Sequence, residues 1–233
     1  PPPGRPVGGL ADLPGPGGRR PGRGAAGVAL VAPRFIALEG VDGSGKSTQA
    51  ALLADALEAR GLAVTRTREP GGTLLGERVR ELLLGDGLGD VDPRAEAHLF
   101  AAARAELVAR VVRPALAEGR WVVSDRFLDS SLAYQGAGRG LGIDLVLEVN
   151  RTAVDGCLPD LALVVDTPLP AAAWRRPARH DRIEAAGEAL QERVAEGYRE
   201  LARRFPGRVR LVPGGGTIQE VHAEVIRAVE PLL

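Results

Sequence analysis

The stretch Gly40-Val41-Asp42-Gly43-Ser44-Gly45-Lys46-Ser47 decides the fold of this chain. It fits the pattern G-x-x-x-x-G-K-[ST], in which glycines allow backbone N–H groups to surround phosphate oxygens. Lys46 is the single Lys among thirty basic residues, and the other twenty-nine are Arg. A compact ammonium reaches between two phosphates where a guanidinium fork is too broad, so a Lys at this one position indicates a phosphate-binding loop.

The segments on either side of the loop have the patterns of a strand and a helix. Residues 34–39 form a short apolar run, and residues 47–60 form a helical pattern that ends at Gly61. This context favours nucleotide binding, because the N-terminus of a helix attracts an anion. We therefore expect the loop and the following Thr48 to bind the phosphates of a nucleoside triphosphate, and the Ser47 hydroxyl to coordinate Mg²⁺.

Length and composition indicate one α/β domain. The 233 residues are 45% hydrophobic and carry no net charge, so there is no overall basic field of the kind found in nucleic-acid-binding proteins. The one cysteine, Cys157, excludes an internal disulfide and is predicted to be a small buried apolar residue. No apolar run approaches the roughly 18 residues that a membrane span needs, so no membrane association is expected.

Residues 1–33 differ from the rest of the chain. Seventeen of these 33 residues are Pro or Gly, which predicts a disordered tail because the segment has too few apolar residues to offset its ordering entropy. Arg19-Arg20 precede a short apolar stretch, but this stretch runs into Pro33 and shows no clean cleavage site. We expect a cytoplasmic protein, with a tail that could have a separate RNA- or partner-binding role.

Apolar strand patterns alternate with helical patterns along residues 34–233. Strands are expected at residues 34–39, 62–67, 120–124, 161–165 and 209–212. Helices are expected at residues 47–60, 74–84, 94–118 with a bend at Pro114, 143–154, 185–204 and 218–229, with a loop at 135–140. The pattern predicts a P-loop NTPase three-layer sandwich: a five-stranded parallel sheet with helices on both faces, and ligands at the carboxyl ends of the strands.

Two further groups of residues are candidates for the site. Asp125 and Arg126 end the strand at 120–124, where the carboxylate suits Mg²⁺ and the guanidinium suits phosphoryl oxygens. Phe100 and Arg104 lie four residues apart on a helix and share a face. An aromatic ring and a planar donor fork are suitable for a nucleobase, by stacking and by hydrogen bonds to a carbonyl edge.

An arginine-rich connection follows the strand at 161–165. Arg175, Arg176, Arg179 and Arg182 lie within eight residues. A solvated charge run is the common explanation of such a stretch. After a phosphate-binding loop, a lid over residues 175–184 that brings Arg to the transferring phosphoryl group is the alternative, with Arg175 and Arg176 on the triphosphate and Arg179 as the first candidate for catalysis.

The chain resembles the bacterial type of the thymidylate kinase family over residues 34–233. Four segments carry this resemblance in order: residues 35–48, residues 67–73 with the sequence T-R-E-P-G-G-T, residues 125–136 from Asp125-Arg126 to Gly136, and residues 159–184, which include Pro159-Asp160-Leu161 and Asp181-Arg182-Ile183-Glu184. The resemblance implies transfer of a phosphoryl group from ATP to dTMP with Mg²⁺, and a homodimer. Gly43 stands where the eukaryotic type has an Arg, which implies that the catalytic arginines come from the lid.

The resemblance also implies roles for individual residues. It places Asp42 on the sugar 3′-hydroxyl, Phe100 on the thymine ring and Arg104 on the edge of the base. It places Tyr134 where a ribose 2′-hydroxyl would be. It places Gln135 beside Tyr134 and Arg68 and Arg126 on the dTMP phosphate, and it includes Ser130 among the residues that bind the acceptor.

Three other functions stay open from the residues alone. One is another P-loop deoxynucleoside or nucleoside monophosphate kinase, which a comparison of acceptors would separate. A second is a P-loop regulatory switch that binds GTP, but such a switch needs an Asn-Lys-x-Asp motif, and Lys46 is the only Lys. The third is an RNA- or partner-binding role of residues 1–33 that adds to the kinase. Phosphoryl transfer to an ionised phosphate needs charge neutralisation rather than a covalent nucleophile, and no Ser-His-Asp set is evident in the chain.

Overall fold

The computed structural model describes residues 32–175, 182–183 and 187–233. Almost all of the expected tail therefore lies outside the described residues, as do Arg176 and Arg179 of the expected lid. Five strands form one parallel sheet: β1 (Phe35–Glu39), β2 (Val64–Arg68), β3 (Trp121–Asp125), β4 (Leu161–Asp166) and β5 (Val209–Pro213). Their order is β2-β3-β1-β4-β5, which confirms the predicted α/β fold.

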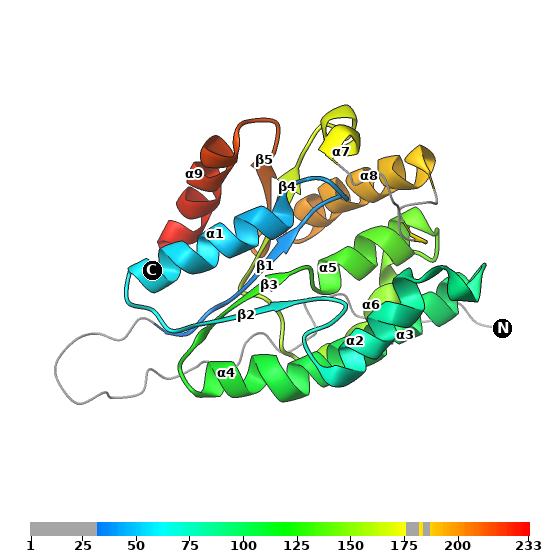
Figure 1. The fold of residues 1–233 in the computed structure, drawn as a ribbon, viewed down its shortest axis with the longest axis horizontal. Helices are drawn as coiled ribbons and strands as arrows, with labels where there is room; N and C mark the ends of the chain where they lie inside the picture. Colours follow the sequence, from blue (N-terminus) through cyan, green and yellow to red (C-terminus); the bar gives the residue numbers. More distant parts are fainter. Residues whose placement is uncertain (1–31, 176–181, 184–186) are drawn as a thin grey trace, which may run out of the picture.

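Helices cover both faces of this sheet (Figure 1). The α-helices are α1 (Lys46–Ala59), α2 (Leu74–Leu84), α3 (Pro93–Leu107), α4 (Arg113–Ala117), α5 (Leu128–Ser131), α6 (Ile143–Val154), α7 (Leu169–Arg175), α8 (Glu188–Arg204) and α9 (Ile218–Val229). Short 3₁₀ turns occur at η2 (Asp86–Leu88) and η6 (Glu230–Leu232), and π-helical turns at η3 (Val108–Val112) and η4 (Leu132–Gly138). No helix in the described ranges is long and apolar enough to cross a membrane.

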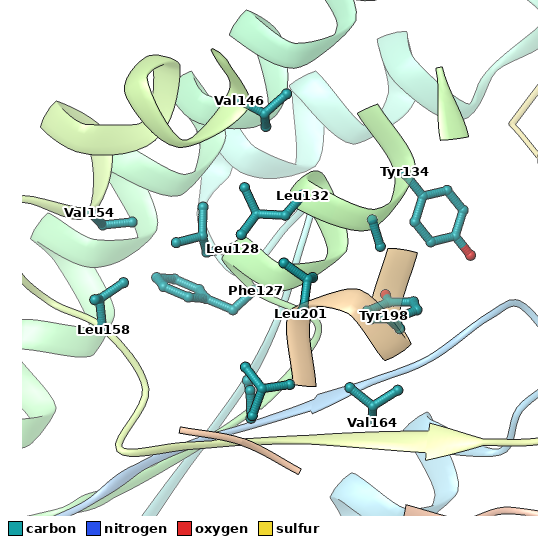
Figure 2. Close-up of a cluster of buried hydrophobic side chains, with 14 of the residues drawn as sticks. Phe127, Leu128, Leu132, Tyr134, Val146, Val154, Leu158, Val164, Tyr198 and Leu201 are labelled. Carbon is teal, nitrogen blue, oxygen red and sulfur yellow. The ribbon is translucent and has the colours of Figure 1, made fainter. Parts of the chain in front are cut away.

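Alternating residues of β1 belong to two separate cores. Phe35 and Ala37 pack with apolar residues of α3, α5, α6 and α8, whereas Ile36 and Leu38 pack with those of α1 and α9. Figure 2 shows part of the first core, where Phe127, Leu132 and Leu201 fill the space between helices and sheet. Because both faces are covered, polar side chains on the strands gather at the carboxyl ends, which is where the site lies.

The long helix expected at residues 94–118 changes its winding before Pro114. The ring of Pro114 lacks an N–H and crowds the carbonyl four residues earlier, and the chain widens into the π-helical turn η3 before α4 begins. The irregularity thus lies one turn earlier than the bend expected at Pro114.

The loop predicted at residues 135–140 is wrong for residues 135–138, which are helical in η4. The glycines here serve close helix packing rather than a turn. A Cβ on Gly138 would lie 2.8 Å from the side chain of Val194 and 2.9 Å from that of Leu190, both on α8. A Cβ on Gly197 of α8 would likewise lie 2.7 Å from Ala137. Close contact between η4 and α8 brings residues of both to one site.

Candidate active site

The phosphate-binding loop connects β1 to α1 as predicted. Gly40, Gly43 and Gly45 have φ values of 142°, 82° and 91°, which L side chains rarely adopt. Gly40 also has no room for a side chain, because a Cβ there would lie 2.9 Å from the carbonyl oxygen of Val165. The Thr167 hydroxyl donates to the Ser44 carbonyl oxygen at 3.1 Å, so the turn after β4 supports the loop.

Lys46 lies in the first turn of α1 with its side chain 9% exposed. Its Nζ atom donates to the Val41 carbonyl oxygen at 3.4 Å and lies 3.7 Å from Asp42 Oδ1. Burial, and then the positive charge of Arg126, lower the pKa of Lys46 to about 8. The ammonium therefore loses its proton far more readily than a solvated Lys would.

Asp42 is surrounded by donors from four parts of the chain. Its Oδ2 atom accepts from the Tyr134 hydroxyl at 2.7 Å and from Gln191 Nε2 at 3.2 Å, and its Oδ1 atom pairs with Arg126. Burial alone would raise the pKa of Asp42, but the charges of Arg126 and Lys46 outweigh it and lower the pKa to about 2. Asp42 is therefore ionised at neutral pH.

Arg126 is the centre of the site. It follows β3 with a φ of 70°, an uncommon conformation for a non-glycine residue, and this conformation marks a functional position. Besides Asp42, the Nη1 atom donates to the Gly40 carbonyl oxygen and the Ser130 hydroxyl, both at 3.0 Å, while Nη2 donates to the Tyr134 hydroxyl at 3.3 Å. One guanidinium thus joins the phosphate-binding loop to α5 and η4.

A buried polar group lies beneath Arg126. Glu39, fully buried at the end of β1, accepts from the backbone N–H of Phe127 at 2.8 Å and from the hydroxyls of Ser130 and Tyr198 at 2.5 and 3.2 Å. Tyr198 also accepts from Arg126 Nη1 at 3.3 Å, and Figure 2 places Tyr198 near the edge of the apolar core. Burial and the negative charge of Asp129 raise the pKa of Glu39 to about 8.

A cavity of about 390 Å³ opens in front of these residues. It is lined by Asp42, Lys46, Ser47, Arg68, Glu69, Pro70, Arg80, Leu84, Phe100, Asp125, Arg126, Ser130, Ser131, Tyr134, Gln135 and Ile183. Charged groups and phosphate-loop residues share the cavity with apolar residues from α2, α3 and the segment before α8. Such a combination is suitable for a ligand with both an anionic and an aromatic part.

Arg68 is the last residue of β2, in register with Asp125 of β3. Its Nη2 atom donates to both carboxylate oxygens of Glu77 at 3.1–3.2 Å, and Glu77 also accepts from the backbone N–H of Gly72 at 3.0 Å. Half of the Arg68 side chain stays exposed at the cavity. This arrangement leaves the guanidinium available to an anion while Glu77 fixes its direction.

Of the two residues predicted to bind a base, Phe100 and Arg104, only the first lines the cavity. Phe100 lines the cavity, but Arg104 is 1% exposed and does not line it. Arg104 donates to Glu69 Oε2 from Nε and Nη2 at 2.9 and 2.6 Å, and also to Ser131 and Asn150. The helix face expected beside the core is in fact part of the core, so Arg104 supports the cavity wall. Its direct contact with a base stays a prediction.

The two side chains predicted to bind Mg²⁺ both carry oxygen atoms and both line the cavity. Ser47 and Asp125 both line the cavity, at the start of α1 and the end of β3. The Oδ1 atom of Asp125 is buried and has no hydrogen-bond partner within the described ranges. A buried carboxylate oxygen without a donor, in a cavity that a Ser hydroxyl also lines, fits the hard oxygen ligands that Mg²⁺ prefers.

The arginine-rich connection is described only at its two ends. Arg175 closes α7, a helix that the sequence analysis did not predict, and its Nη1 atom lies 3.4 Å from the Gly214 carbonyl oxygen. Arg182 pairs with Glu96 at 2.6 Å. Arg176 and Arg179 lie outside the described residues, so their roles stay predictions.

Comparisons with known proteins show the family to which the chain belongs. The family model described as thymidylate kinase matches residues 38–225. A thymidylate kinase of Pelotomaculum thermopropionicum is 50% identical over 203 residues, with 86% of this chain and 94% of the relative covered. That of Rhizorhabdus wittichii is 50% identical over 204 residues, with 86% and 98% covered. The chain belongs to the thymidylate kinase family.

A crystal structure of a member of this family agrees with the fold. The thymidylate kinase from Ehrlichia chaffeensis superposes with a TM-score of 0.71 at 35% identity, covering 85% of this chain and 99% of that chain. Membership in the thymidylate kinase family confirms the predictions of a nucleotide-binding kinase and of a P-loop α/β fold.

Sequence reasoning missed the carboxylates and α8 residues that hold the arginines, or the Asp42 and Ser130 side chains that contact Arg126, in this thymidylate kinase fold. These are Glu39, Glu69, Glu77, Glu96, Gln191 and Tyr198. Glu39 carried a usable signal, because a charged residue at the end of an apolar strand is rarely buried without a partner. Gln191 and Tyr198 lie on a polar helix about 150 residues from Asp42 and Glu39, and no local pattern connects them.

Proposed function

We propose that this chain transfers the γ-phosphoryl group of ATP to dTMP, giving dTDP and ADP. The observation that carries the proposal is the single cavity that contains Lys46 and Ser47 of the phosphate-binding loop together with Arg68, Arg126 and Phe100. The loop is suited to the donor triphosphate, the two arginines to the acceptor phosphate and the aromatic ring to a base. In the reaction an oxygen of the dTMP phosphate forms a bond to the γ-phosphorus, and the bond to the β–γ bridging oxygen breaks.

The residues of the site bind and orient the phosphates through their charges, and none of them is assigned as a general base. Lys46 offers a compact charge to the β- and γ-phosphates, and Arg126 holds the acceptor phosphate beside the loop through its bond to the Gly40 carbonyl. Asp42, ionised and hydrogen-bonded to Tyr134, is placed for a sugar hydroxyl, and Tyr134 occupies the space of a ribose 2′-hydroxyl. Mg²⁺, held by Ser47 and Asp125, would neutralise phosphate charge. Arg175, Arg176 and Arg179 are proposed to add positive charge at the transferring group.

We further propose a cytoplasmic homodimer. Support for self-association comes from α2 and η2, where Leu74, Leu75, Leu82 and Leu88 are exposed by 82%, 47%, 47% and 45%. Leu75 and Leu82 lie seven residues apart, close to two helical turns, and so share one face of α2. An apolar face on one helix is suitable for packing against the same face of a second copy.

A panel of nucleoside monophosphates assayed with ATP and Mg²⁺ tests the proposed function. We expect dTMP to be the best acceptor, dUMP to be weaker, and purine monophosphates to be poor, because Phe100 and the apolar residues that line the cavity with it are suited to one small ring. Thymidine itself should not be phosphorylated, since the arginines need an anionic acceptor. Equal turnover of dGMP or AMP, or preference for thymidine, would contradict the proposal.

A pH profile tests the state of Lys46. Its pKa of about 8 predicts that kcat/KM for ATP falls about tenfold per pH unit above that value, as the ammonium becomes neutral. Bound phosphates stabilise the charged amine, so the fall in kcat itself should begin at higher pH. Because Glu39 also has a pKa near 8, Glu39→Gln is the control and should keep the same fall. A flat profile between pH 7 and 9.5 would refute this assignment.

A further inference from the structure

One buried carboxylate joins three segments around the proposed acceptor cavity. Glu96, fully buried in the first turn of α3, accepts from Gln135 Nε2 at 2.9 Å, from Arg139 at 3.2–3.3 Å and from Arg182 Nη2 at 2.6 Å. These donors come from η4, from the residue that follows it and from the far end of the arginine-rich connection. Glu96 therefore fixes parts of the chain that are 39 to 86 residues away from it in sequence.

Arg182 has a second set of contacts, at the end of α2. Its Nε atom donates to the Leu83 carbonyl oxygen at 3.0 Å, and its backbone N–H donates to the Leu84 carbonyl oxygen at 3.4 Å. The last carbonyls of a helix lack partners within the helix and attract a cation. Since Glu96 lies at the start of α3, Arg182 connects the carboxyl end of one helix with the amino end of the next, and only 12% of its side chain is exposed.

The residues beside this pair line the cavity. Ile183, directly after Arg182, is 6% exposed and forms the cavity wall together with Leu84 and Phe100. Gln135, whose amide is bonded to Glu96, lines the same cavity. The Glu96–Arg182 pair thus contacts one residue of the cavity wall, Gln135, and adjoins another, Ile183.

We propose that Arg182 is a positioning residue for the acceptor nucleoside and does not contact the transferring phosphoryl group. With Glu96 it forms a clasp that seats Ile183 and Gln135 against the nucleoside part of the acceptor. This inference rests on the proposed function and separates Arg182 from the other arginines of its connection. An arginine that meets charge in the transition state affects kcat, whereas a residue that shapes the acceptor cavity affects KM for dTMP.

Kinetics of Arg182→Gln, Glu96→Gln and the double variant test the clasp. We expect each single variant to raise KM for dTMP at least fivefold, with kcat within about threefold and KM for ATP within about twofold of the wild type. The effect of the double variant should be clearly smaller than the product of the two single effects, because each single variant already removes the shared Arg182–Glu96 interaction. Ile183→Ala should raise KM for dTMP in the same way without changing the Arg182–Glu96 pair itself.

Arg78→Gln is the matched control. In the described ranges Arg78 lies on the exposed side of α2 and pairs only with Glu81, so this variant should have the kinetic constants of the wild type.

Two results would overturn the proposal. A fall of more than tenfold in kcat for Arg182→Gln at unchanged KM for dTMP would place Arg182 on the transferring group. Independent, multiplying effects of the two single variants would show that there is no clasp. Thermal unfolding of the same four proteins without nucleotide measures the coupling of the pair separately. If the wild type fails to phosphorylate dTMP, the proposed function fails, whereas additive losses of Tm in this cycle reject the clasp itself. If Glu96→Gln does not fold, Arg182→Lys replaces it in the test, because this variant keeps the positive charge but loses the guanidinium that joins Glu96 to the Leu83 carbonyl oxygen.

Discussion

Lys46→Ala is expected to lower kcat by ~10²–10³-fold while the protein stays folded, because removing one preorganised electrostatic group from an active site costs about that much. Lys46 makes a single long hydrogen bond to the loop, at 3.4 Å, so its loss removes little native structure. Steady-state turnover at saturating ATP and dTMP measures the effect, and thermal unfolding measures the fold.

The matched variant Lys46→Arg is expected to leave most of this loss in place. The side chain of Lys46 is 9% exposed and lies between the Val41 carbonyl and Asp42, where a planar guanidinium has too little room. Arg126 already occupies the adjoining space beside Asp42. Wild-type turnover by Lys46→Arg would refute the argument that a compact charge is needed here.

Arg126→Gln is expected to lower kcat/KM for dTMP by at least about 30-fold. Breaking a buried, hydrogen-bonded charge pair costs about 2–5 kcal/mol, and Arg126 also holds Ser130 and the Gly40 carbonyl. Arg126→Lys should rescue little of the loss, because one ammonium cannot reach all of these partners. The control is Arg113→Gln, an exposed arginine paired with Asp155 away from the cavity, which should leave kcat/KM unchanged.

The stability of Arg126→Gln at acidic pH is a second measurement on this variant. The pKa of Asp42 is about 2 in the folded protein, below its ordinary value of 3.8, so its contribution to stability is present above pH 3.8 and disappears as the pH falls toward 2. Without the charge of Arg126 that pKa rises toward the ordinary value. We therefore expect the free energy of unfolding of Arg126→Gln to depend less on pH in this window. An unchanged pH dependence would show that Arg126 does not hold Asp42 ionised.

The sequence by itself determined the fold and the donor side of the site. Gly40, Lys46 and Ser47 are contiguous, and the strand and helix beside them have clear periodic patterns, so local sequence was sufficient for both. Asp125 and Arg126 were also predictable, because carboxyl ends of parallel strands meet at one edge of the sheet. The pattern failed where Gly138 packs against α8 and Gly136 packs against the start of α6 instead of forming a turn, and it missed α7.

Only the tertiary structure decided which groups hold the arginines in place. Arg104 was predicted to bind a base and Arg182 to lie in the lid, yet the first is buried against Glu69 and the second against Glu96. The partners of these pairs are 35 and 86 residues apart, and Tyr198 meets Glu39 across 159 residues. Ion pairs and hydrogen bonds over such separations leave no local periodicity, because their geometry exists only once sheet and helices have packed. The sequence therefore defined the chemical groups of this site, and packing defined which residues line the cavity.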